Sequence, residues 1–214
     1  MTVSTGDYMW FEERFQDLAD SYCLTLVHEV PPTELMHRLG GRPEPVRTGI
    51  AALLEAAYDF YAPFGGTGMR TLFGMTSIGP WTLMVEPNGC LGVDEERALP
   101  ASVGSRWISH YDNNNANNDG SFLWVENTDR RLQFDLRDAG CRNGSRPNEL
   151  LEVIRSLGFE FPEEPITTDG PDPAPDADLA VAAAFALAEH LTQVRLKPSH
   201  FDEATFICGS AEIE

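Results

Sequence analysis

Apolar residues in the first third of the chain recur every three or four positions. Between Tyr8 and Val27 this spacing places them in one stripe along an α-helix. The segment "PPTELMHRLGG" predicts a short second helix, because proline is tolerated in a first turn and glycine suits the C-terminal cap. A third helix is predicted from about Thr48, which suits an N-cap, over "GIAALLEAAYDFY". We therefore expect a helical N-terminal region.

The middle of the chain has a different pattern, in which aromatic and β-branched runs alternate with turn residues. Asn88-Gly89 is expected to form a tight hairpin turn, because both residues tolerate positive φ angles. The pattern predicts a meander of about five strands. The candidate runs are "MRTLFGMTSI", "WTLMVE", "CLGV", "SRWISHYD", "SFLWVEN" and "RLQFDL".

The C-terminal part returns to helical patterns. Pro147 is expected to begin the helix "PNELLEVIRSLG", and residues 162–178, rich in Pro, Asp and Glu, read as an exposed acidic linker. The helix "LAVAAAFALAEHLTQV" should dock back onto the main body, and "ATFICG" is either a strand or an apolar tail. We predict a single α+β domain, residues 1–214, whose antiparallel sheet of about five strands (mainly 69–136) is flanked by N-terminal and C-terminal helices.

Composition narrows the set of possible partners. The chain has 34 acidic and 15 basic residues in 214, a formal net charge of −19. Because phosphate binding requires clustered Lys and Arg, direct contact with nucleic acid or an anionic membrane is unfavourable, whereas a basic protein partner is compatible. Solubility alone also explains such a charge.

Location and redox state follow from similarly simple features. The first apolar stretch is interrupted at Glu12, Glu13 and Arg14, so we expect no secretory signal, and the apolar run 179–188 is too short to cross a membrane. The four scattered cysteines form no C-x-x-C pair and are expected to be reduced thiols. We expect a cytoplasmic protein.

The stretch "NNNANNDGSFLWVE", residues 113–126, nearly matches a calcium-binding loop. The ligand positions would be Asn115, Asn117, Asp119 and Glu126, with Gly120 at the sharp turn. An amide replaces the first carboxylate, however, and the flanking segments resemble strands where a calcium loop has helices. We interpret the stretch as a polar hairpin tip, with an asparagine-rich recognition surface as the remaining alternative.

His110 and Asp112 are two positions apart on a predicted strand and therefore point the same way. They could bind a metal together or act as a base with its orienting carboxylate, although no third ligand is evident. The chain has no nucleophile elbow and no glycine-rich phosphate loop. We predict no cofactor and assign no catalytic residue, and His110, Asp112 and the calcium-loop positions stay weak metal candidates.

Several segments together resemble an uncharacterised actinobacterial domain-of-unknown-function family over nearly the full length. They are "DYMWFEERFQDLADSYCLTLV", "WTLMVEPNGCLG", "SHYDNNNANN", "AEHLTQVRL" and "ATFICG". The resemblance implies no activity, cofactor or catalytic residue. It does imply that the N-x-N-A pattern occurs without the rest of a calcium loop.

Strand alternation places Trp107 and Tyr111 on one face of a sheet, followed by Asn113 and Asn115, and these four are our candidate binding residues. We expect a non-enzymatic protein-binding factor, such as an inhibitor, an immunity-type protein or an adaptor. The alternatives are a metal-dependent hydrolase-type enzyme using His110 and Asp112, and an acidic mimic of nucleic acid.

Overall fold

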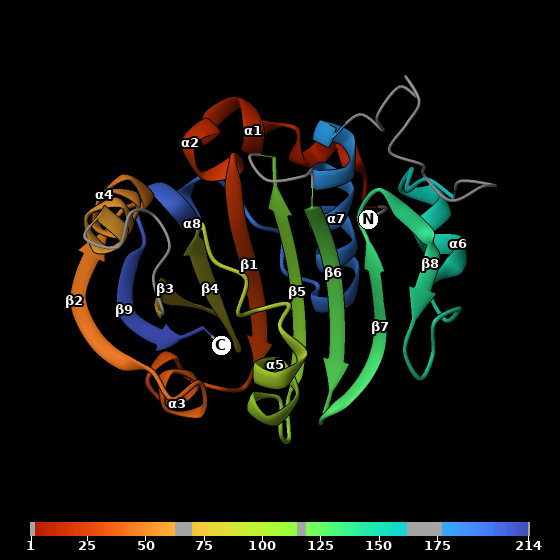
Figure 1. Ribbon diagram of the computed structural model, residues 1–214. Helices are drawn as coiled ribbons and strands as arrows, with labels where there is room; N and C mark the ends of the chain where they lie inside the picture. The colour runs from red at the N-terminus through yellow and green to blue at the C-terminus, as the bar shows by residue number, and fades with distance from the viewer. Residues whose placement is uncertain (1–2, 63–69, 115–118, 162–176, 214) are drawn as a thin grey trace.

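Nine strands form one antiparallel sheet in the computed structural model, which describes residues 3–62, 70–114, 119–161 and 177–213. Their spatial order is β2-β9-β3-β4-β1-β5-β6-β7-β8 (Figure 1). Strands that are remote in sequence thus become neighbours, with β1 between β4 and β5 and β9 between β2 and β3. The bounds are β1 Ser21–His28, β2 Arg42–Thr48, β3 Arg70–Ile78, β4 Trp81–Pro87, β5 Arg106–Asn113, β6 Asp119–Glu126, β7 Asp129–Asp135, β8 Asp138–Asn143 and β9 Thr205–Glu212.

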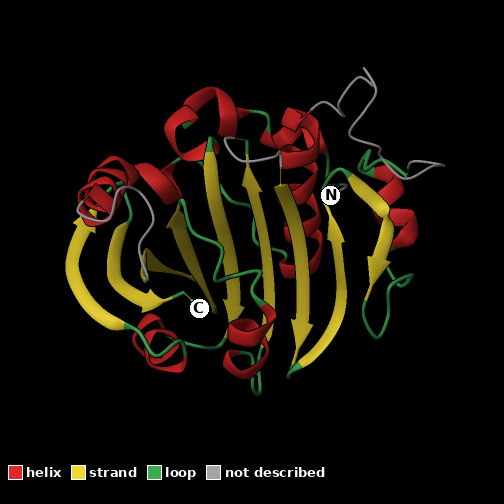
Figure 2. Cartoon of the chain, in the orientation of Figure 1, coloured by secondary structure: helices red, strands yellow, loops and turns green. Residues whose placement is uncertain are grey.

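Helices pack on both faces of this sheet (Figure 2). On one face α7 contacts β5 and the 3-10 helix η1, and on the other face α3 and α5 contact each other beside the central strands. Two hydrophobic cores result, one on each face. The bounds are η1 Thr5–Tyr8, α1 Trp10–Arg14, α2 Gln16–Ala19, α3 Pro32–Arg38, α4 Ile50–Tyr61, α5 Glu95–Ala101, α6 Leu151–Ser156, α7 Ala177–Thr192 and α8 Ser199–Asp202.

The prediction of about five strands with helices only at the two ends is wrong, and the largest error lies in the first thirty residues. The predicted helix from Tyr8 to Val27 is broken into η1, α1 and α2 and then becomes β1, a central strand. Seven of the eight β1 residues are buried, because the strand is covered on both faces. Such a strand lacks apolar-polar alternation, so its apolar positions also fit a helical period.

The other missed strands carry little hydrophobic signal. β2, "RPEPVRT", is an edge strand with mostly exposed residues and two prolines, which are tolerated only where a strand has a free side. β8, at the opposite edge, is also polar. β9 resolves the open choice for "ATFICG", since this segment is a strand inserted between β2 and β3.

The expected hairpin at Asn88-Gly89 is also absent, because "CLGV" is not a strand. Asn88 does adopt a positive φ of 55°, but Gly89 does not have a positive φ, so the two-residue hairpin turn does not form. The chain instead passes through a loop into α5, and β4 pairs with β1 and β3. The predicted linker at 162–178 lies almost wholly outside the described residues.

Candidate binding site

His110 and Asp112 lie on the same face of β5, as strand alternation predicts, and both are buried. His110 Nδ1 is 3.1 Å from the Tyr22 hydroxyl, and its ring packs against Phe185 with 4.6 Å between centroids. Burial lowers the pKa of His110 to about 3, so its imidazole is neutral at physiological pH. Asp112 forms an ion pair of 2.8 Å with Arg137. Burial raises the pKa of Asp112 to about 6, although Arg137 opposes that shift.

The candidate calcium residues are spread along a strand. Asp119 pairs with Asn113 at one end of β6, and Glu126 pairs with Arg106 at the other end. Glu126 is seven residue steps of extended chain from Asp119, a distance of about 24 Å, which is too far for one ion. Glu126 forms an ion pair with Arg131 at 3.1 Å. Asn115 and Asn117 lie outside the described residues, and within the described ranges no group of three or more His, Cys, Asp or Glu side chains could hold a metal ion.

The candidate binding residues on β5 divide into two kinds. Trp107 is fully buried, and its indole Nε1 donates a 2.8 Å hydrogen bond to the Gly92 carbonyl, so it belongs to the core. Tyr111 and Asn113 are half-buried farther along the same face. Asn115 lies outside the described residues. Of the three candidates that the structure describes, Tyr111 and Asn113 are therefore within reach of a partner on this face.

A buried carboxyl group that sequence reasoning missed lies beside this face. Glu86, at the end of β4, accepts hydrogen bonds from the backbone N–H groups of Leu91 (2.8 Å) and Gly92 (2.9 Å). Burial raises its pKa to about 7. Burial and the nearby Glu86 also raise the pKa of the Cys90 thiol to about 11. A thiol with that pKa stays protonated at neutral pH and is a poor nucleophile, so this cluster serves to hold the loop after β4.

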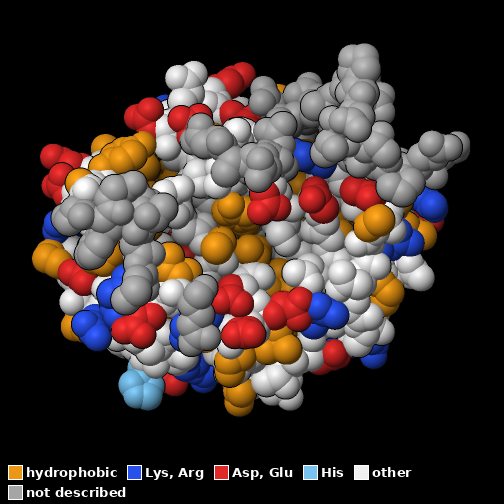
Figure 3. Space-filling model, viewed as in Figure 1, with side chains coloured by type: hydrophobic (Ala, Val, Ile, Leu, Met, Phe, Trp, Pro, Cys, Tyr) orange, Lys and Arg blue, Asp and Glu red, His pale blue; other side chains and the backbone are white. Residues whose placement is uncertain are grey.

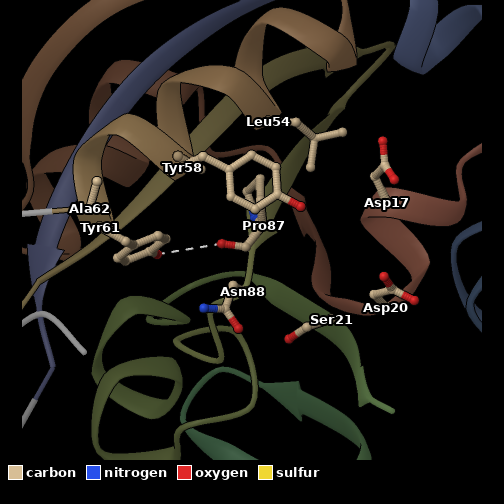
Figure 4. A pocket seen from close by; sticks show the side chains of 10 residues that line it. Asp17, Asp20, Ser21, Leu54, Tyr58, Tyr61, Ala62, Pro87 and Asn88 are labelled. Atoms are coloured by element: carbon tan, nitrogen blue, oxygen red, sulfur yellow. Dashed lines mark hydrogen bonds between the residues drawn. The ribbon is translucent and has the colours of Figure 1, made fainter. Parts of the chain in front are cut away.

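A hollow of about 370 Å³ lies between α2 and α4, where β1 begins and β4 ends (Figure 4). Apolar and aromatic side chains of α4 form one side, and two aspartates of the α2 region stand on the other. We call this space the α2–α4 hollow. Its lining residues are Asp17, Asp20, Ser21, Leu54, Ala57, Tyr58, Tyr61, Ala62, Pro87 and Asn88.

Hydrogen bonds fix the wall that Tyr61 provides. Its hydroxyl lies 2.6 Å from Thr71 Oγ1, accepts the Leu72 N–H at 3.2 Å and donates to the Pro87 carbonyl at 3.4 Å. On the adjoining side, the Asn88 N–H donates to the Ser21 carbonyl at 2.9 Å. The wall is therefore formed before any ligand arrives, which lowers the entropic cost of binding.

Ser21 has the most unusual environment in the hollow. It is only 7% exposed, yet its Oγ makes no hydrogen bond within the described part of the chain. A buried hydroxyl without a partner costs free energy, and beside a hollow a ligand group or an ordered water can supply the missing bond. In Figure 4 this side chain extends between Asp20 and Asn88.

Exposed acidic and aromatic side chains lie at the rim of the hollow. Asp17 and Asp20 are exposed, and Tyr58 is 62% exposed, which is unusual for an aromatic side chain on a helix that packs against a core. Figure 3 shows acidic side chains along the upper margin of the molecule, around α2 and α4, with hydrophobic ones between them. Arrangements of carboxylates beside an aromatic wall suit a cationic group with an aliphatic stem, such as Lys or Arg.

None of these hollow residues was predicted as a site residue. Asp17 and Asp20 were assigned to a continuous helix, which would have carried them away from the start of a strand. One signal in the sequence was available. Tyr58 lies four positions after Leu54 in a strong helix pattern and close to Glu55, so this pattern places Tyr58 near the border between the apolar and the polar side of α4.

The whole chain, residues 1–214, matches one protein family, described as "Family of unknown function (DUF6461)". The chain belongs to this family. The expected resemblance to a full-length family of unknown function is thus confirmed, while an actinobacterial origin stays a prediction. No curated protein and no solved structure matches the chain. Every helix in the described ranges falls short of the length and hydrophobicity that a membrane crossing requires.

Proposed function

We propose that this member of the family is a non-enzymatic cytoplasmic protein that binds a partner protein by accepting one of its basic side chains in the α2–α4 hollow. The observation that carries the proposal is the buried, unpartnered hydroxyl of Ser21 at a hollow whose rim holds Asp17 and Asp20. A Lys or Arg head group would hydrogen-bond this hydroxyl and the carboxylates together. Its methylene stem would lie along Tyr58 and Leu54.

The net charge of −19 also favours a basic partner. Long-range attraction would speed the encounter with a basic partner, and the hollow would then provide the specific contact. His110 and Asp112 give less support to a hydrolase-type reaction, because both are buried and already engaged with Tyr22 and Arg137. An inhibitor, immunity-type or adaptor role is compatible with this kind of binding.

The direct test is an NMR titration of isotope-labelled protein with N-acetyl-arginine amide at low salt. We expect shift changes at Ser21, Tyr58 and Asn88, and none with N-acetyl-glutamate amide at the same concentration. In the Asp17→Asn/Asp20→Asn double variant binding should weaken about tenfold, since two exposed ion pairs are each worth up to about 1 kcal/mol. Glu160→Gln, which removes an exposed carboxylate elsewhere, is the matched control.

The natural partner would be sought by affinity capture from host lysate with the wild-type protein and the same variants. A partner retained by wild type and Glu160→Gln but lost by the double variant would support the proposal. If arginine amide changes no signal around the hollow, or if the double variant binds as well as wild type, the proposal is wrong.

A further inference from the structure

A second hollow, of about 430 Å³, adjoins the α2–α4 hollow. It lies between α4 and the α1–α2 region, and it shares Asp17 and Leu54 with the first hollow. The two hollows are therefore adjacent, and we call them together the α4 groove. The lining residues of the second hollow are Glu13, Arg14, Phe15, Gln16, Asp17, Ile50, Ala51, Leu54 and Asp202.

The helix α4 sets the length of this groove. Ile50, Ala51 and Leu54 line the second hollow, and Leu54, Ala57, Tyr58, Tyr61 and Ala62 line the first. These positions recur every three or four residues, so they form one stripe along the whole helix. The two groups are displaced by about seven residues, which corresponds to about 10 Å at 1.5 Å per residue.

The second hollow is also acidic. Glu13, Asp17 and Asp202 outnumber its single basic lining residue, Arg14. Arg14 is already engaged, because its Nη2 lies 2.8 Å from Asp202 Oδ2 and its guanidinium lies 5.8 Å from the Phe15 ring centroid. A second basic side chain entering from a ligand would therefore meet uncompensated negative charge at Glu13 and Asp17.

A single side chain cannot fill both ends of a groove with this spacing. An extended chain rises by about 3.1 to 3.4 Å per residue, so two residues three positions apart are about 10 Å apart. In the polyproline II conformation, which has three residues per turn, these two side chains also point the same way. The spacing of the two acidic hollows matches this geometry.

We propose that the α4 groove binds an extended basic segment of the partner protein, with two basic residues three positions apart, one in each hollow. This inference rests on the proposed function and adds the partner's conformation and spacing. The side chains between the two basic residues cross Leu54, which lines both hollows. A second copy of this chain is a poor occupant, because its own net charge of −19 would oppose docking on an acidic groove.

Two synthetic peptides of identical composition provide the test. Acetyl-Ala-Arg-Ala-Ala-Arg-Ala-amide has the proposed spacing, and acetyl-Ala-Ala-Arg-Arg-Ala-Ala-amide has adjacent arginines. By NMR titration at low salt we expect the first to bind about fivefold more tightly, the effect of one additional exposed ion pair. Only the first peptide should shift signals at both Tyr58 and Ala51.

Two substitutions in the second hollow distinguish this inference from the proposed function. Glu13→Gln and Ala51→Arg should each remove the higher affinity of the spaced peptide and leave the affinity of the adjacent-arginine peptide unchanged. The Glu160→Gln control should keep the higher affinity of the spaced peptide. Equal affinities of both peptides for wild type would overturn the spacing, although the proposed function would stand if Asp17→Asn/Asp20→Asn still weakened both. If neither peptide shifts the signals of Ser21 or Tyr58, both proposals are wrong. A dimer in sedimentation equilibrium that Ala51→Arg dissociates would assign the groove to a second copy instead.

Discussion

Glu86 offers the sharpest test of the electrostatics in the core. Two opposing effects act on this carboxyl group, since burial favours its neutral form and the N–H groups of Leu91 and Gly92 favour its charged form. Burial dominates, and the pKa rises from 4.5 to about 7. A difference of about 2.5 pH units between the folded and unfolded states corresponds to about 3 kcal/mol.

The sign of the effect follows from proton binding. Between pH 4.5 and 7 the folded state holds a proton on Glu86 that the unfolded state has lost, so the free energy of unfolding falls as pH rises through this window. The contribution is fully present below pH 4.5 and is lost above pH 7. Glu86→Gln removes this dependence. We therefore expect the free energy of unfolding to fall by about 3 kcal/mol more for the wild-type protein than for the variant between pH 4 and pH 8.

Urea unfolding followed by tryptophan fluorescence at five pH values measures this difference directly. Other titrating groups, including His110, are common to both proteins and cancel in the comparison. Glu96→Gln, which removes an exposed carboxylate on α5, is the matched control. A difference that stays flat would refute the burial argument. A difference of the opposite sign would show that the two N–H groups dominate and that the carboxylate is the preferred form in the fold.

Three further substitutions test other parts of the core by the same unfolding measurement. Between pH 7 and pH 4 the free energy of unfolding of wild type should fall by about 3 kcal/mol through His110, because the lowered pKa of this residue makes the fold lose stability as pH falls. His110→Phe should abolish this fall, and a variant with the same pH dependence as wild type would contradict the reasoning. Arg137→Met should lower the free energy of unfolding by about 3 to 5 kcal/mol at pH 8, because it leaves the Asp112 carboxylate buried and unpaired. The loss should be smaller at pH 5, where Asp112 takes up a proton, and equal losses at both pH values would count against the ion pair. Gly92→Ala should cost several kcal/mol, because its Cβ would lie 2.0 Å from Thr25 Oγ1, and a variant as stable as wild type would show that the loop after β4 can move away.

Local pattern predicted those elements whose ends are marked by turn or capping residues. The strand β3 lies in a predicted run, and β6 and β7 also meet as expected, through a two-residue turn in which Asn127 and Thr128 both have positive φ. The helices α4 and α7 follow their apolar periods. In each case the hydrophobic residues mark one chemical environment, and the flanking turn residues mark where it ends.

Prediction failed for β1 and β2 for different reasons. β1 is buried on both faces and directly follows the short helix α2, so no glycine or proline marks where it begins, whereas β2 is exposed at an edge and carries two prolines. β4 is also buried throughout, but Gly79-Pro80 before it and Asn88-Gly89 after it marked it as a strand. Sheet order adds a second limit, because nothing local to β9 indicates that it will separate β2 from β3. Such pairings depend on contacts between residues far apart in sequence, which a window of neighbouring residues does not report.

The candidate site was missed for the same reason that β1 was missed. The α2–α4 hollow forms where the short helix α2 ends at Ala19 and the central strand β1 begins at Ser21, and the helical period across that junction conceals the change. Once the strand is recognised, its first side chain must lie at the end of the sheet, next to the β4 terminus with which β1 pairs. Farther along the same strand the Thr25 hydroxyl has a side-chain partner in Ser109 of β5, whereas the Ser21 hydroxyl at the strand end has none in the described part of the chain. The topology thus places Ser21 beside the hollow, with Asp20 directly before it and Asp17 one turn earlier, and this arrangement is the basis of the basic ligand that we propose.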